Sequence, residues 1–149
     1  MEQQMMSAEK GATPSKTKRI FYWIFTALVA FELLLGATWD FNWVNQSFVR
    51  NVMSHLGYPP YMDTLLGLAK IPAAIILLIP GFLILKEWAY AGTVFIFAGA
   101  VFSHIAMGDG WAGALFPAIY TLLTLASWAL RPAKRKLTPE KSIVVLRWF

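Results

Sequence analysis

An apolar stretch that carries one lysine constrains the fold more than any other feature. Residues 62–85 read MDTLLGLAKIPAAIILLIPGFLIL, with Lys70 in the first half and Pro72 two residues later. At about 1.5 Å of rise per residue, 22 helical residues cover roughly 33 Å, the thickness of a hydrocarbon core. A charged side chain at that depth costs about 2.5–3.5 kcal/mol on insertion scales. Lys70 therefore needs a partner, a cavity or a short reach to the surface.

The composition places the whole chain in the same environment. Its mean hydropathy is +0.54 and only 14% of its residues are charged, which indicates a polytopic protein with the lipid bilayer as its main partner. The net charge of +5 does not indicate nucleic acid, because the basic residues flank apolar segments. The absence of cysteine excludes disulfides, thiolate metal sites and covalent c-type haem. A redox role would use a noncovalent cofactor such as a quinone.

The apolar pattern predicts an all-α fold, a four-helix membrane bundle formed by residues 20–131. Lys86 and Glu87 are read as the turn between the second and third helices. Residues 1–19 are polar and are predicted to be a disordered leader. Residues 132–149 are predicted to be a basic cytoplasmic tail. The expected membrane helices are 20–38, 63–85, 88–107 and 111–130.

The connection between the first two membrane segments has a helical pattern of its own. Val44, Phe48, Val52 and Leu56 recur every four residues with polar side chains between them. This spacing predicts an amphipathic helix that lies on the surface or caps the bundle. Lysine and arginine flank the other side of the bundle almost exclusively, and only Arg50 lies on this side. Both termini are therefore predicted to be cytoplasmic and the amphipathic helix to face outward.

Three helices are expected to place ionisable side chains at similar depths in the outer half. Glu32 and Lys70 lie about 9 Å from the outer ends of their segments, and His104 about 5 Å from its own. No comparable cluster is expected in the inner half. Asp109 follows His104 in a short turn and joins the three as a candidate for ligand binding or proton exchange. The expected rim of this pocket is Asp40, Asp63, Trp39 and Trp111.

These residues have three readings that the sequence leaves open. Glu32 and Lys70 are a structural ion pair that fixes helix register, or Lys70 reaches outward along its own stem, or a polar pocket opens to the outer face. Buried Lys and His near a carboxylate are the usual groups with shifted proton affinity. His55 is expected to be solvated. No metal site is predicted, because too few ligands converge.

Several segments together resemble the DoxX-like family of small bacterial four-helix membrane proteins. They are Leu56–Pro59 (LGYP), Gly67–Pro80, Lys86–Gly92 (KEWAYAG) and Ser103-His104 before Gly108-Asp109. The resemblance covers residues 20–132 and implies a multi-pass bacterial inner-membrane protein with both termini inside. The family takes its name from similarity to DoxD, the membrane subunit of a thiosulfate:quinone oxidoreductase. Many relatives have a glutamate near the position where this chain has Lys70, and Glu32 on the neighbouring helix is a candidate to supply the acid instead.

Three functions follow as hypotheses. The first is a redox-associated protein that binds a quinone or small solute in the outer pocket, with Lys70 and His104 donating hydrogen bonds and Glu32 exchanging the proton. Electrons would come from a membrane or soluble oxidoreductase partner. The second is a non-catalytic membrane scaffold or subunit. The third is a small-solute transporter, for which four helices would need to form a homo-oligomer.

Overall fold

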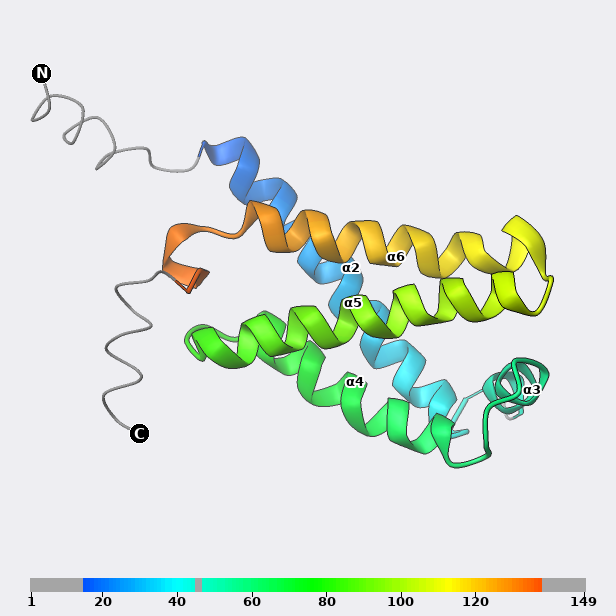
Figure 1. Ribbon diagram of the computed structural model, residues 1–149. Coiled ribbons are helices and arrows are strands. Elements are labelled where there is room, and N and C mark those ends of the chain that lie inside the picture. Colours follow the sequence, from blue (N-terminus) through cyan, green and yellow to red (C-terminus); the bar gives the residue numbers. More distant parts are fainter. Residues whose placement is uncertain (1–14, 45–46, 138–149) are drawn as a thin grey trace, which may run out of the picture.

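The computed structural model describes residues 15–44 and 47–137, and this part of the chain contains five α-helices and a short 3₁₀ turn. The predicted leader and tail lie mostly outside the described residues. Figure 1 shows how the elements follow one another along the chain. The helices are α2 (Lys16–Asp40), α3 (Phe48–His55), α4 (Met62–Leu78), α5 (Leu83–Ala106) and α6 (Gly110–Leu130), followed by η1 (Ala133–Arg135).

Three of these helices, α2, α5 and α6, are long and apolar enough to cross a membrane. The remaining expected span, residues 63–85, corresponds to α4, which has 17 residues and a length of about 26 Å. Large apolar side chains of all four helices are exposed on the outside of the fold, as lipid-facing side chains are; examples are Phe31, Leu68, Phe95 and Leu122. The chain is therefore an all-helical protein that associates with lipid.

The prediction of a turn at Lys86 and Glu87 was wrong. The second helix ends at Leu78, and both residues lie in the first turns of α5. Ile79 is extended because it precedes Pro80, whose ring disfavours the helical conformation at the residue before it. Gly81 and Phe82 then adopt positive φ angles of 78° and 50°, which reverse the chain.

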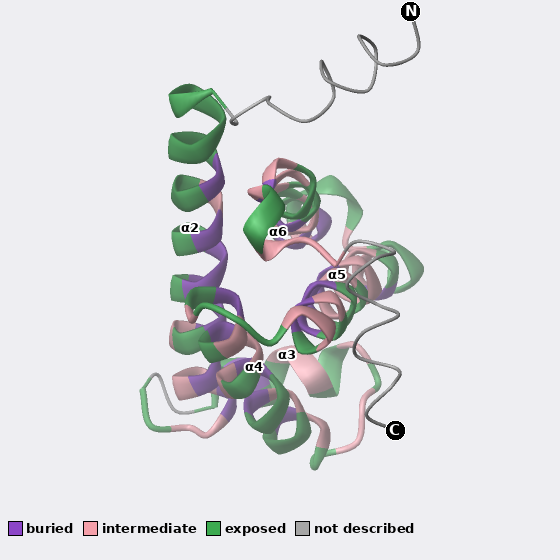
Figure 2. Cartoon of the chain, turned by 90° about the vertical axis from the view of Figure 1, so that its left-hand side faces the viewer, coloured by how far each residue is buried: buried purple, intermediate pink, exposed green. Residues whose placement is uncertain are grey.

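The four long helices form two pairs that are close at one end and separate at the other. Helix α2 packs along α4, and α5 packs along α6. In Figure 1, α4 diverges from α5 as it runs away from the α4–α5 turn, and α3 lies at the wide end between the pairs. Figure 2 shows that the buried residues of α2 follow one side of that helix, which faces the others.

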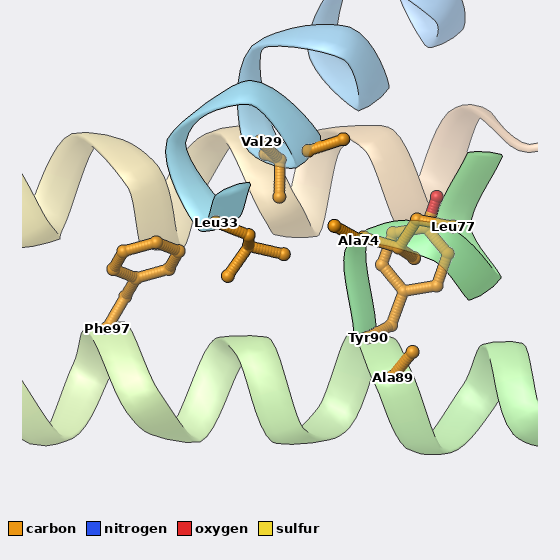
Figure 3. Close-up of a cluster of buried hydrophobic side chains, with 8 residues drawn as sticks. Val29, Leu33, Ala74, Leu77, Ala89, Tyr90 and Phe97 are labelled. Carbon is orange, nitrogen blue, oxygen red and sulfur yellow. The ribbon is translucent and has the colours of Figure 1, made fainter. Parts of the chain in front are cut away.

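The hydrophobic core lies where the two pairs meet. Figure 3 shows Val29 and Leu33 of α2 beside Ala74 and Leu77 of α4, with side chains of α5 closing the cluster from below. Val29, Leu33 and Ala74 have no exposed surface, and Leu77 is 1% exposed. This cluster closes the narrow end and leaves the wide end open for a cavity.

Gly67 sets how closely α2 approaches α4 at the wide end. A β-carbon at Gly67 would lie 2.9 Å from the ring of Phe41 and 3.1 Å from Cβ of Asp40. We expect Gly67→Ala to lower the free energy of unfolding by about 1–3 kcal/mol, because the added methyl group overpacks the contact. Gly92→Ala is the matched control, since a β-carbon there meets nothing within 4 Å. Thermal unfolding of both variants in detergent measures this, and equal melting temperatures would contradict the close contact.

Candidate functional site

A cavity of about 710 Å³ lies between the two separated helix pairs, beneath α3. All five helices contribute to its wall, and most of the lining side chains are apolar. The polar groups are few and lie on opposite sides, with Glu32, Asp40 and Lys70 on the α2–α4 pair and His104 on α5. The expected polar pocket is thus an apolar cavity with two polar patches.

The α2–α4 side holds a buried ion pair. Lys70 Nζ lies 2.8 Å from Asp40 Oδ2, and the two residues are 8% and 1% exposed. A Glu32–Lys70 pair was one of the three readings of the sequence, and Asp40 was predicted at the rim of the pocket. The structure differs because α2 ends at Asp40 and the four-carbon stem of Lys70 extends outward along α2 to reach it.

Glu32 lies beside this ion pair, on the side nearer the narrow end of the bundle. A β-carbon at Gly36 would be 2.9 Å from Lys70 Nζ and 3.1 Å from Glu32 Oε1, so both side chains occupy the space over this glycine. Glu32 is 7% exposed. Within the described residues, its Oε2 atom and the Oδ1 atom of Asp40 have no hydrogen-bond partner. The ion pair therefore leaves unpartnered carboxyl oxygens at the cavity.

The α5–α6 side carries a histidine held by a carboxylate. His104 Nδ1 lies 2.6 Å from Asp109 Oδ2, and His55 Nε2 of α3 lies 2.6 Å from Asp109 Oδ1. The hydrogen bond with His104, followed by that with His55, holds the pKa of Asp109 below its usual range. His55 was expected to be solvated; its side chain is 54% exposed and also ties α3 to the α5–α6 turn.

Two further contacts hold α3 in place over the cavity. Arg50 Nη2 lies 3.2 Å from Oδ2 of Asp63 at the start of α4, and Tyr58 OH lies 2.7 Å from Ser103 Oγ of α5. Asp63 therefore does not line the cavity but anchors α3. Neither contact was predicted, since both join residues from different elements.

The inward face of α3 largely matches the predicted stripe, because Phe48, Val52 and Leu56 line the cavity. The exception is Val44, which precedes the helix and is 52% exposed. Val49, which the stripe did not include, is the buried residue of α3. The α3 side chains and the following residue that line the cavity are Phe48, Val49, Val52, Met53 and Leu56. The helix thus caps the cavity, one of the two placements that its pattern allowed.

The two tryptophans proposed for the rim have different positions. Trp39 lines the cavity and packs edge-on against Phe48, with 5.7 Å between ring centroids. Trp111 is 83% exposed and does not contribute to the lining. This difference makes Trp39 a local probe of the cavity and Trp111 its control.

The narrow end of the bundle also contains a charged cluster, contrary to the expectation that only the half with Glu32, Lys70 and His104 would have one. Lys86 is fully buried and its ammonium group donates to the backbone carbonyl groups of Ile76 and Ile79. Arg131 forms a bidentate ion pair with Glu87, in which Nη1 and Nη2 donate to Oε1 and Oε2 at 2.8 and 3.1 Å. Lys86 thus caps the end of α4, whereas the Arg131–Glu87 pair joins the end of α6 to the start of α5; none of the three side chains lines the cavity. Across the described ranges, no group of three or more metal-ligating side chains is arranged to hold an ion.

We expect Asp109→Asn to lower the melting temperature near pH 7 and to have less effect in acid. The folded-state pKa of Asp109 is depressed, so its stabilising contribution is present above the usual value of 3.8 and is lost as the pH falls through the folded value. Melting curves of the two proteins at pH 7 and pH 3 test this. A difference that persists unchanged at pH 3 would show that the carboxylate charge is not responsible.

Together, these features define a multi-pass helical membrane protein with a capped cavity. A family model described as the DoxX-like family matches residues 24–127. The chain therefore belongs to the DoxX-like family, as its motifs indicated. No curated protein and no solved structure matches it.

Proposed function

We propose that the chain is a bacterial inner-membrane protein in which α2, α4, α5 and α6 form the four-helix membrane bundle. The basic side chains gather at the narrow end, where Arg19, Lys86 and Arg131 lie, while Arg50 lies at the wide end. The positive-inside rule then supports cytoplasmic termini and a cavity that faces outward. The short helix α4 is accommodated because polar side chains cap both of its ends.

We further propose that the cavity binds a quinone or a similar small amphipathic molecule in a redox-associated role. The observation that carries this is the buried Asp40–Lys70 pair, with Glu32 beside it, in the wall of an otherwise apolar cavity of about 710 Å³. Ligand pockets of about 300–1,000 Å³ are typically apolar with a few fixed polar groups. The ammonium group of Lys70 has three N–H donors, and those that do not face Asp40 can donate to a ligand carbonyl. Glu32 can exchange a proton with the ligand.

A tryptophan-quenching titration with a short-chain quinone tests this proposal. We expect saturable quenching in the purified protein, a smaller amplitude in Trp39→Phe, and an unchanged binding curve in Trp111→Phe. Lys70→Met should weaken binding if its fold is retained, which circular dichroism checks. Non-saturable quenching that is identical in all variants would mean partition into the micelle, and would refute quinone binding.

A scaffold role is the second candidate, because the Asp40–Lys70 contact joins α2 to α4 beside the close packing at Gly67. In that case the ion pair would fix helix register and the cavity would have no specific ligand. The same titration separates the two candidates, since a scaffold predicts no dependence on Trp39.

A further inference from the structure

The charges around the cavity do not balance. Its α2–α4 side presents the carboxyl groups of Glu32 and Asp40 but only one ammonium group, that of Lys70. Lys70 lies against Asp40 at 2.8 Å and shares the space over Gly36 with Glu32, so one ammonium group faces two acids and Glu32 is the acid that has no ion pair of its own among the described residues. Glu32 is 7% exposed and its Oε2 has no partner among the described residues. An isolated buried carboxylate costs several kcal/mol, and such a group neutralises itself by binding a proton unless a cation is supplied.

The other ionisable groups around Glu32 do not provide that cation. Asp40 of α2 is itself an acid, and Tyr120 of α6 is neutral near pH 7. His104 of α5 lies against Asp109 instead. Helix α3 directs Arg50 to Asp63 and His55 to Asp109, and lines the cavity with apolar side chains. Among the described residues, the site therefore holds one acid more than its cations can compensate.

The rest of the wall suits a lipophilic cation. The aromatic rings of Trp39, Phe48, Phe97 and Phe116 line the cavity, and aromatic faces attract cations through their quadrupole. Phe95 and Phe116 line the cavity and are also 75% and 52% exposed on the lipid-facing surface. The cavity thus extends to the hydrocarbon side of the bundle, where a lipophilic molecule would enter.

We propose that this cavity is a binding site for a lipophilic organic cation, and that the bound cation replaces a proton on Glu32. In the exchange the Glu32 carboxylic acid loses its O–H proton to water, and the carboxylate that remains pairs with the cation. One positive charge enters the site for each proton released, so no oxidant or reductant is needed. The proposal rests on the cavity being a ligand site, and it adds a ligand class that differs from a quinone.

Tetraphenylphosphonium is a suitable probe, because it is a lipophilic cation with no hydrogen-bond donor. Isothermal titration calorimetry of the full chain in detergent, in two buffers of different ionisation enthalpy, gives both affinity and proton count. We expect saturable binding, release of about one proton, and affinity that rises with pH from 6 to 8, since protons compete with the cation. Neutral tetraphenylmethane-type analogues should show only partition into the micelle.

Substitutions of glutamate test whether Glu32 is the acid that releases the proton. Glu32→Gln should weaken binding by roughly 30-fold or more and abolish proton release. Glu87→Gln, at the opposite end of the bundle, is the matched control and should bind as the unaltered protein does. Glu32→Asp keeps the charge and should retain proton release, which preserves the test if Glu32→Gln fails to fold.

The outcomes separate this inference from the proposed function. Cation binding without proton release, or equal binding to Glu32→Gln, would overturn the inference. Quinone binding with no cation binding would overturn it and leave the proposed function standing. Failure of both ligands would overturn both.

Discussion

Lys70→Met is expected to lower the free energy of unfolding by about 3–5 kcal/mol, because it removes the one cation in the described part of the chain that faces two buried acids. Asp40 is 1% exposed, so it cannot recover the lost interaction by turning to water. Methionine matches the length of the lysine stem, and the apolar contacts are largely kept. The variant therefore reports on the charge rather than on packing. Thermal unfolding in detergent measures the change.

Double-mutant cycles then show which acid is the partner of Lys70. Lys70→Met combined with Asp40→Asn should recover much of the loss, with a coupling energy of about 1–3 kcal/mol, because no unpaired charge remains between these positions. The cycle with Glu32→Gln should give a smaller coupling, since the 2.8 Å contact of Lys70 is with Asp40. Larger coupling to Glu32 than to Asp40 would contradict the observed pairing.

Counting residues along apolar segments predicted that Glu32, Lys70 and His104 would lie at similar depths. Depth along a helix depends only on rise per residue and on where the helix begins, and α2, α4 and α5 begin or end near the expected outer positions. All three residues line the cavity. Depth alone does not give this result, because it does not set which side of a helix a residue faces. The size and the apolar lining of the cavity result from the divergence of the two helix pairs.

The ion-pair and hydrogen-bond partners of these side chains could not be predicted from depth. Lys70 has a long flexible stem, and from the sequence it could reach either Glu32 or Asp40. The bridge from His55 through Asp109 to His104 joins α3 to a turn more than fifty residues later in the chain, so no helical spacing predicts it. Such pairs depend on the tertiary arrangement of elements, which periodicity does not contain.

At the end of α4, the local sequence Pro80-Gly81 indicates the helix boundary better than hydropathy does. Residues 79–85 are apolar apart from Pro80 and Gly81, so the span was extended through them to the charges at residues 86 and 87. The proline followed by glycine was the better signal, since a proline lacks the N–H group that a helix needs and a glycine readily adopts positive φ. Hydropathy gives the depth of a segment, whereas backbone chemistry determines where it ends.

Pro80 also explains why Lys86 is buried at the narrow end of the bundle. In a continuous helix the carbonyl group of Ile76 would accept the N–H of residue 80, and Pro80 has none. Lys86 donates to this carbonyl and to that of Ile79, while Arg135 donates to the carbonyls of Leu77 and Leu78 at 3.0 and 2.9 Å. Four successive carbonyl groups at the end of α4 are thus satisfied by two cations.

We accordingly expect Lys86→Met to lower the free energy of unfolding by about 3–5 kcal/mol, because two buried carbonyl groups lose charged donors. Lys18→Met is the control; Lys18 is exposed on α2, and its substitution should change stability by less than about 0.5 kcal/mol. Hydrogen exchange should also rise selectively at residues 76–85 in the Lys86 variant. If Lys86→Met unfolds like the control, the carbonyl groups at the end of α4 do not depend on the ammonium group. The short α4 would then need another source of polar partners inside the membrane.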